Sequence, residues 1–172
     1  MNSQQIKEIL LSEIHEVSIN YEKYCNNPKR DFSRKRKLPF ELMLKNIIGM
    51  GSKSITNELI DIFQASGEMP SASAFVQQRT KIKPEALKAV FDGFMSRILT
   101  SADKMRILAV DGSDIQIETN PKDETSHISS STDKKSFNLL HLNALYDLEE
   151  HVYSDAIIQA AKNQNEHGAL NE

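Results

Sequence analysis

The chain has 172 residues, with 21 lysines and arginines against 24 aspartates and glutamates. This length suits one domain, or one domain with part of a second, and 39% hydrophobic with 26% charged residues excludes wholesale disorder. A single cysteine excludes an internal disulfide and fits a reducing compartment. No apolar stretch approaches the roughly 18 residues of a membrane span, and the first residues lack the basic-then-apolar layout of a secretory signal. We therefore expect a cytoplasmic protein with no membrane partner.

The charge is distributed unevenly along the chain. Residues 29–37 (KRDFSRKRK) carry a net charge of +5, whereas residues 110–172 carry −8. Between and before them, residues 38–109 carry +2 and residues 1–28 carry −2. Such polarity indicates one part that binds polyanions and a separate part that is rich in carboxylates.

Hydrophobic spacing predicts that the first hundred residues are all-helical. Apolar residues three and four apart predict an amphipathic helix over residues 3–25, with Ser3 as its N-cap and Cys25 in its core. Four more helices are predicted: one from near Pro39 to Gly49–Gly51, one that begins at Ser52 or Ser54 and stops at Gly67, a short one over 71–82, and one that Pro84 opens.

The pattern then changes from helical to extended. Residues 106–111 (RILAVD) predict a strand buried on both faces, which residues 114–118 extend past a bulge or bend. Residues 119–136 are polar and without periodicity, so they predict a loop. Residues 137–147 and 151–159 predict two strands joined by a tight turn, as in a hairpin.

Asp111 is the first candidate for chemistry, because it closes the predicted strand beside Gly112. A carboxylate at the end of a buried strand is well placed to hold a hard divalent cation. An Asp before Gly also simply forms a turn, and that alternative stays open. Asp114 is three residues away and, in an extended chain, points to the opposite face. The pair reads Asp-x-x-Asp and not the Asp-x-Asp of a phosphatase-like site.

Six basic side chains make residues 29–37 a candidate phosphate-binding patch, with Phe32 available to pack or stack. A solvated charge run explains the same composition. On the predicted helix over 71–82, a Gln-Gln-Arg run either touches DNA or faces solvent (Gln77, Gln78 and Arg79). The six basic residues are Lys29, Arg30, Arg34, Lys35, Arg36 and Lys37.

The other polar residues lack the spacing of a familiar site. His141, Asn143, His151 and His167 do not form a zinc pattern, and we interpret them as residues of a sheet edge or loop. Cys25 has no convincing His partner in the sequence. The chain contains no Gly-rich phosphate loop and no nucleophile elbow.

Five segments, in order, resemble the N-terminal half of DDE transposases of the insertion-sequence-four type. They run from about Arg30 to Leu170 and read RKRKLPFELMLKNIIGMGSKSITNEL, PSASAFVQQRTKI, ILAVDGSDI, FNLLHLNALYDL and DAIIQ followed by NEHGAL. The resemblance implies an α+β fold: an all-helical, DNA-binding domain over 1–103, then the first three strands of an incomplete, ribonuclease-H-like mixed sheet over 104–172. It also implies that Asp111 is the first of three catalytic carboxylates.

The resemblance further implies a metal-dependent reaction on DNA. Such enzymes hydrolyse a phosphodiester at the transposon end, and the freed 3′-hydroxyl then attacks target DNA. Both steps are in-line displacements at phosphorus, stabilised by two Mg²⁺ or Mn²⁺ ions about 4 Å apart. Asp111 would share those ions with an Asp and a Glu from elsewhere in the fold, while the basic stretch neutralises backbone phosphates. The expected partners are transposon-end and target DNA, which would associate the protein with the nucleoid.

The resemblance implies that the second catalytic Asp lies on a further strand, beside the first strand. None of the three predicted strands is that further strand. Asp155 belongs to the third strand, about 10 Å from the first with another strand between, so we interpret it as structural. We therefore expect this chain alone to be inactive, and the open edge of its first strand to invite self-association. A non-catalytic DNA-binding or regulatory protein and a decayed reading frame stay open as alternatives.

Overall fold

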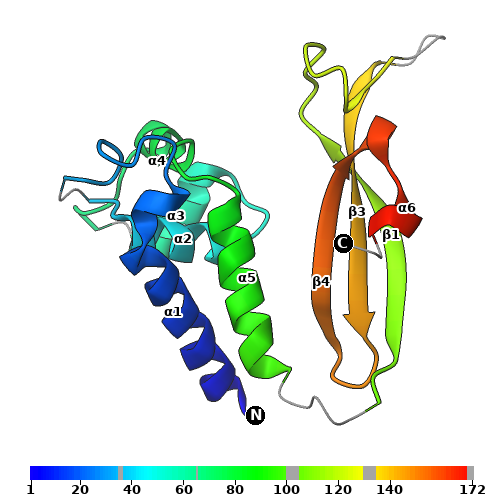
Figure 1. Cartoon of the computed structure of the whole chain (residues 1–172). Helices are drawn as coiled ribbons and strands as arrows, with labels where there is room; N and C mark the ends of the chain where they lie inside the picture. The colour runs from blue at the N-terminus through cyan, green and yellow to red at the C-terminus, as the bar shows by residue number, and fades with distance from the viewer. Residues whose placement is uncertain (35–36, 65, 100–104, 130–134, 170–172) are drawn as a thin grey trace. The chain divides into compact units, whose positions relative to one another are not determined.

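The structure is a computed structural model that describes residues 1–34, 37–64, 66–99, 105–129 and 135–169. The chain divides into two compact units, a helical unit up to residue 100 and a sheet unit from residue 101 onward. In the part of the chain that the structure describes, five α-helices precede the strands of one antiparallel sheet, so the fold is α+β (Figure 1). The predicted boundary between residues 103 and 104 lies outside the described residues.

The helical unit confirms the all-helical character that hydrophobic spacing predicts. Among the described helices, none reaches the length and apolarity that crossing a membrane would require. The elements are α1 (Ser3–Ile19), the 3-10 helix η1 (Tyr21–Tyr24), α2 (Phe40–Gly49), α3 (Ile55–Phe63), α4 (Ala72–Arg79) and α5 (Glu85–Ile98).

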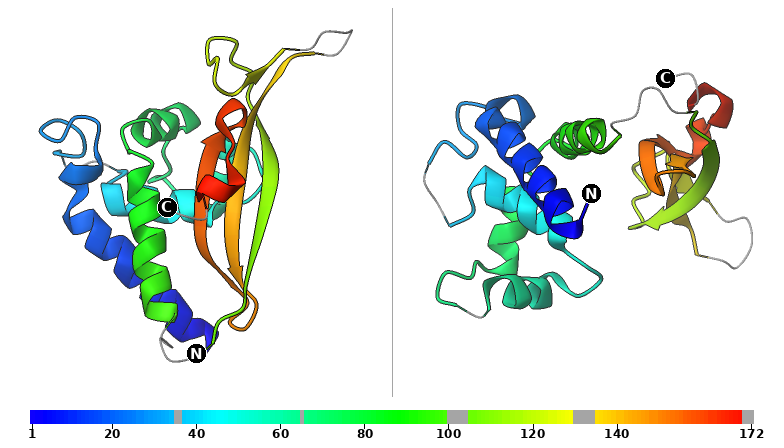
Figure 2. Two further views of the ribbon diagram at one scale, coloured as in Figure 1. Left: turned by 45° about the vertical axis from the view of Figure 1, so that its right-hand side comes forward. Right: turned by 90° about the horizontal axis from the view of Figure 1, so that it is seen from below.

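Two apolar clusters hold the helices together. α1 and α5 lie side by side in both Figure 1 and Figure 2, and the first cluster fills the space between them and α2. The second cluster joins α2, α3 and α4. The buried members of the first are Ile14, Val17, Cys25, Phe40, Leu44, Ala86 and Val90; those of the second are Leu38, Met43, Leu59 and Phe75.

The N-terminus of α1 lies one residue earlier than the sequence predicts. Asn2, not Ser3, is the N-cap: its side chain accepts the backbone N–H of Gln5, and the Gln5 side chain accepts that of Asn2. This reciprocal pair satisfies two N–H groups that the first turn would otherwise leave unpaired. Ser3 therefore becomes the first helical residue.

Two helix ends also differ from the prediction. α1 ends at Ile19 and does not reach Cys25, which lies beyond η1 and forms an isolated antiparallel bridge with Ile82. α3 ends before the predicted stop at Gly67, because Gln64 adopts a left-handed conformation with φ 49° and its N–H bonds back into the helix. Cys25 is nevertheless a core residue, with no exposed surface.

The sheet unit is built around β3. This strand pairs antiparallel with β1 on one side and with β4 on the other, as Figures 1 and 2 show. The hairpin of β3 and β4 confirms the predicted strand pair, whereas the predicted loop over 119–136 also contributes the short β2 to the sheet. The elements are β1 (Leu108–Ile117), β2 (His127–Ile128), β3 (Phe137–Asp147), β4 (Val152–Ala160), η2 (Ala161–Asn163) and α6 (Glu166–Ala169).

β1 differs from the predicted strand in extent and in burial. The predicted extension of the strand by residues 114–118 is confirmed as far as Ile117, but the predicted bulge or bend is wrong, because β1 pairs with β3 in unbroken register from Leu108 to Ile117. Most of its side chains are exposed, and not buried on both faces. Burial on both faces needs a layer packed on each face, and the described part of the sheet unit holds only the short η2 and α6 besides its strands. Asp111 therefore lies inside the strand and not at its end.

Candidate functional site

The basic segment belongs to a loop that is fastened at both ends. At its start, the backbone N–H of Asn26 donates to the Lys81 carbonyl at 3.0 Å, and the Asn26 side-chain amide donates to the Thr80 carbonyl at 2.8 Å. At its end, the Lys37 ammonium donates to the Gly67 carbonyl at 2.8 Å. These bonds tie residues 26–37 to chain segments 30 or more positions away.

Inside the loop, the acidic residue and the aromatic residue face the helices. Asp31 is 5% exposed, and its Oδ2 accepts the backbone N–H of Asn27 at 2.9 Å. Phe32 has a left-handed backbone with φ 55°, and its ring packs edge-to-face on Phe40 with centroids 5.2 Å apart. Phe32 thus packs against the helices but remains partly exposed. Among the described cations of the loop, Lys29, Arg30, Arg34 and Lys37 are exposed.

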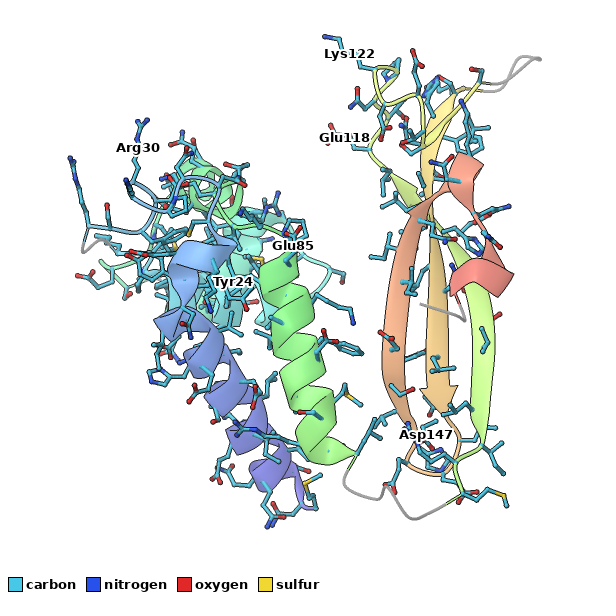
Figure 3. All side chains as sticks on the ribbon, viewed as in Figure 1. Tyr24, Arg30, Glu85, Glu118, Lys122 and Asp147 are labelled. Atoms are coloured by element: carbon cyan, nitrogen blue, oxygen red, sulfur yellow. The ribbon has the colours of Figure 1, made fainter. Side chains whose placement is uncertain are left out.

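A groove of about 580 Å³ lies against this loop. Its lining brings together Lys29, Arg30 and Arg34 from the loop with Lys81, which follows α4. Gln78 of α4 also lines the groove, with its Oε1 accepting from the Lys81 ammonium at 3.1 Å. In Figure 3, Arg30 projects from the loop away from the helices. Four cations around one depression attract anions more strongly than the same charges spread over a surface.

The other predicted DNA contacts have different positions. Lys35 and Arg36 lie outside the described residues. Lys37 does not line the groove, since its ammonium holds the Gly67 carbonyl. Gln77 and Arg79 are exposed on α4 but are not part of the groove lining. Lys81 is the groove residue that sequence reasoning did not single out, although a Lys-Ile-Lys run before a proline was a visible signal.

Asp111 lies on one face of the sheet among small side chains. It is directly opposite Ala144 on β3, and Ala144 is opposite Ala156 on β4. Opposed residues of an antiparallel ladder point to the same face, so two alanines flank the carboxylate. Asp111 is exposed, and within the described part of the chain no hydrogen bond or ion pair engages its carboxylate. It is therefore accessible to a ligand.

Asp114 and Asp155 occupy the opposite face. Asp114 is three positions along β1, and its Oδ1 lies 2.9 Å from Nδ1 of His141. Asp155 is opposite Leu145, which is in turn opposite Val110, the neighbour of Asp111. The offset of three residues thus separates the faces as the sequence predicts. Neither carboxylate shares the face of Asp111.

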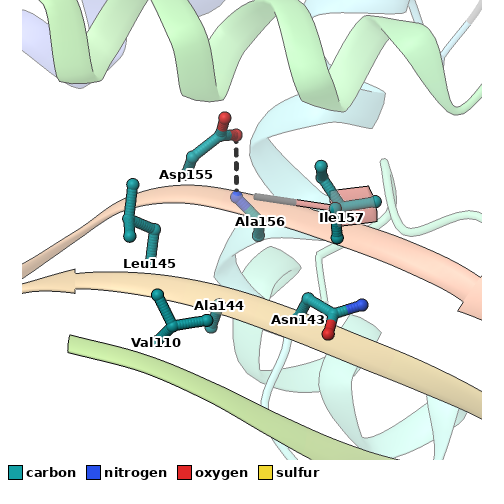
Figure 4. A pocket seen from close by; sticks show the side chains of 8 residues that line it. Val110, Asn143, Ala144, Leu145, Asp155, Ala156 and Ile157 are labelled. Atoms are coloured by element: carbon teal, nitrogen blue, oxygen red, sulfur yellow. Dashed lines mark hydrogen bonds between the residues drawn. The ribbon is translucent and has the colours of Figure 1, made fainter. Parts of the chain in front are cut away.

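Asp155 lines a small pocket of about 90 Å³ on that face, shown in Figure 4. Val110, Asn143 and Ile157 contribute to the lining, together with Ala169 at the end of α6. The dashed line in Figure 4 marks the bond from the Ala156 N–H to the Asp155 carboxylate, 2.8 Å long. Asp155 is both two strands away from β1 and on the wrong face to share an ion with Asp111.

His141 and Asn143 are not edge or loop residues, which corrects the sequence interpretation. Both lie on the central strand β3, and each is 6% exposed. His141 contacts Asp114, and the Asn143 amide donates to Gln159 Oε1 at 3.2 Å. His151 lies in the exposed turn before β4, and the side chain of His167 lies outside the described residues.

Asp147 is a buried carboxylate that sequence reasoning did not single out. It is the last residue of β3, where Figure 3 labels it, and it has no exposed surface. One oxygen accepts the N–H groups of Glu149 and Glu150 at 2.9 and 3.0 Å, and the other accepts from Arg106 Nε at 2.6 Å. The Glu150 N–H first, and then the Arg106 guanidinium, hold the pKa of Asp147 below its ordinary 3.8. This carboxylate is structural, because all of its contacts close the hairpin and tie it to the start of β1.

A metal site made entirely by this chain is not visible in its described part, where no group of three or more His, Cys, Asp or Glu could hold an ion. Asp111 fits as one hard oxygen ligand for Mg²⁺ or Mn²⁺, because it is anionic, exposed and flanked by small residues.

Comparisons with models of known protein families, with curated proteins and with solved structures find no match to this chain. The likeness to transposases therefore rests on the sequence segments alone.

Proposed function

We propose that this chain binds DNA through its helical unit and carries, on β1, the first catalytic carboxylate of a DDE transposase of the insertion-sequence-four type. One observation carries the proposal: the strands pair in the order that the resemblance implies. The three segments assigned to the first three strands form the antiparallel order β1–β3–β4. A ribonuclease-H-like sheet begins with this arrangement, and the exposed Asp111 lies on its first strand.

Asp111 would act by holding a divalent ion close to a DNA phosphate. Mg²⁺ or Mn²⁺, when bound, stabilises the charge that develops during displacement at phosphorus. Asp111 supplies a hard anionic oxygen for such an ion. Its neighbours across the ladder on the same face, Ala144 and Ala156, have short side chains. The groove cations of the helical unit would supply affinity for the DNA backbone without reading its sequence.

DNA binding is tested by fluorescence anisotropy with a labelled duplex of random sequence at several salt concentrations. If four to six basic residues contact phosphates, log affinity should fall against log salt with a slope of about −4 to −5. Replacing Arg34, Lys35, Arg36 and Lys37 with Ala should weaken binding and flatten the slope. A wild-type affinity that does not change with salt, or an unchanged affinity in the variant, would refute DNA binding by this segment.

The role of Asp111 is tested with Mn²⁺ as a paramagnetic probe in the presence of duplex DNA. Amide signals of Ala109, Ser113 and Ala144, which surround Asp111 in the ladder, should broaden on addition of Mn²⁺. Asp111→Asn should remove this broadening, whereas Asp114→Asn, the same change three residues away on the opposite face, should leave it. Broadening that survives Asp111→Asn shows that this carboxylate does not hold the ion.

A non-catalytic DNA-binding protein is the second candidate. The groove favours it, because Lys29, Arg30, Arg34 and Lys81 all belong to the helical unit and do not require the sheet. Such a protein would occupy transposon ends and compete with an active transposase. In a transposition assay, excess of this chain would then inhibit, and Asp111→Ala would inhibit equally well.

A further inference from the structure

We propose that the groove between the basic loop and the C-terminal end of α4 is a preformed seat for the phosphate backbone of duplex DNA, with Lys81 and Gln78 as contacts beside Lys29, Arg30 and Arg34. This inference deepens the proposed DNA binding and rests on it. The DNA-binding site is then not a linear run of charges but is built from two chain segments, the basic loop and the residues around Lys81, which lie some 50 positions apart.

The two sides of the groove are joined by backbone hydrogen bonds. Asn26 bonds to Lys81 and Thr80, and the N–H of Lys83 donates to the Tyr24 carbonyl at 2.8 Å. The buried bridge between residues 25 and 82 lies between these bonds. The pairing fixes the backbone at residue 81 against the backbone at residue 26, where the basic loop begins. The two sides of the groove are thus held together before any ligand binds.

Residues 27–33 of the loop are held by local hydrogen bonds. The carbonyl of Asn27 accepts the N–H groups of Arg30 and Asp31 at 3.0 and 2.8 Å, and the Ser33 hydroxyl donates to the Arg30 carbonyl at 2.9 Å. Phe32 then anchors the loop by packing on Phe40. A mobile charge run would bind DNA at an entropic cost for ordering each side chain and the backbone. The hydrogen bonds and the ring contact hold residues 27–33 in place without DNA, so that cost is smaller for this part of the loop.

The chemistry of the lining selects a polyanion. Four cations line the groove, and its one acidic residue, Asp31, is buried and directs Oδ2 to the Asn27 N–H. The Lys81 ammonium, held at Gln78 Oε1, keeps further donor hydrogens for a phosphate oxygen. The groove has cations on two sides, which suits the phosphates of a duplex backbone. Phe32 also lines the groove, but its ring packs edge-to-face on Phe40, whereas a single strand needs a free aromatic surface for its bases.

The experiment compares full-length variants that change one charge at a time. Lys81→Gln should weaken binding to a labelled duplex about tenfold at 50 mM salt and reduce the salt slope by about 0.9, the value for one lost phosphate contact. Lys81→Arg keeps the charge and should restore both. Lys7→Gln is the matched control: Lys7 is an exposed lysine in the first half of α1, outside the groove lining, and its loss should leave the slope unchanged. Circular dichroism checks that each variant is folded.

The outcomes separate this inference from the proposed function. If the wild-type chain does not bind duplex DNA at all, the proposed function fails. If Arg30→Gln weakens binding but Lys81→Gln behaves like Lys7→Gln, the loop binds DNA and the two-sided groove is refuted. The two-sided groove is also refuted if Lys81→Gln weakens binding to single-stranded DNA or RNA but leaves binding to duplex DNA unchanged.

Discussion

Cys25 shows how burial controls the chemistry of a single residue. It has no exposed surface, and burial, with a smaller contribution from the nearby charge of Asp31, raises the pKa of its thiol from 9.0 to about 11. The thiolate is the reactive form of cysteine. Cys25 therefore acts as a small apolar core residue and not as a redox group or a nucleophile.

We predict that Cys25 in the folded protein reacts very slowly with a disulfide reagent such as Ellman's reagent at pH 8. With a pKa of about 11, only about 0.1% of the thiol is ionised at that pH, and burial blocks access as well. The absorbance change should become rapid and correspond to one thiol once the protein is unfolded in guanidinium. Rapid labelling of the folded protein would show that Cys25 is exposed.

The second prediction concerns Asp147 and acid stability. Its pKa is lowered in the folded state, so its contribution to stability is fully present above its unfolded pKa, near 3.8, and is lost as pH falls through the folded value. Urea unfolding of the wild type should therefore show a steep loss of stability below about pH 4. Asp147→Asn should be less stable at pH 7 and should lose less stability on acidification. Parallel pH dependences in the two proteins would exclude this role for Asp147.

At the scale of elements, the packing of α1 on α5 depends on a glycine. Glu13 of α1 is 7% exposed and forms an ion pair with Arg97 of α5. Gly93 lies beside it, and a Cβ at that position would clash with the Glu13 carboxylate. Gly93 therefore costs helix propensity but allows the Glu13 carboxylate to be buried at the helix interface, where it pairs with the exposed Arg97.

This arrangement predicts a sign change in a double-mutant cycle. Gly93→Ala alone should destabilise the protein by about 1 kcal/mol or more, because the buried Glu13 carboxylate must move. In a Glu13→Ala background the same change should stabilise by up to about 1 kcal/mol, because only the gain in helix propensity remains. Urea unfolding of the four proteins measures both values. An equal effect in the two backgrounds would mean that Glu13 does not limit this position.

At the scale of the whole molecule, we predict that the 172-residue protein by itself does not cut DNA. Two-metal displacement requires several carboxylates around the ions. The register places Asp114 and Asp155 on the face opposite Asp111, so neither can join it. A single carboxylate holds Mg²⁺ weakly, since this ion then keeps most of its water.

The measurement uses labelled duplex DNA with Mg²⁺ or Mn²⁺, and Asp111→Ala as the control. No cleavage by either protein is the expected result. Cleavage by the wild type that disappears in Asp111→Ala would show that this chain supplies a complete site. Cleavage by both proteins would indicate a contaminating nuclease, and the preparation would then be repurified before the comparison is made.

The sequence by itself determined the α+β class and the approximate position of the five helices and of the β3–β4 hairpin. These features depend on local periodicity and on turn residues, which a single sequence displays directly. It also determined that Asp111 and Asp114 lie on opposite faces, because side chains alternate along any strand. The exact helix ends were less predictable, since Asn2 and Gln64 compete with equally plausible neighbours for the capping positions.

Only the tertiary structure decided which residues gather at one place. The exposure of β1 depends on which layers pack on the two faces of the sheet, and the sequence of β1 does not contain that information. In the same way, the groove requires Lys81 to lie beside Arg30, which follows from backbone pairing between residues 26 and 81. Contacts between segments far apart in the chain arise from packing of the whole unit. A local sequence pattern can predict Arg30 or Lys81 separately as a phosphate contact, but only the folded chain places both around one groove.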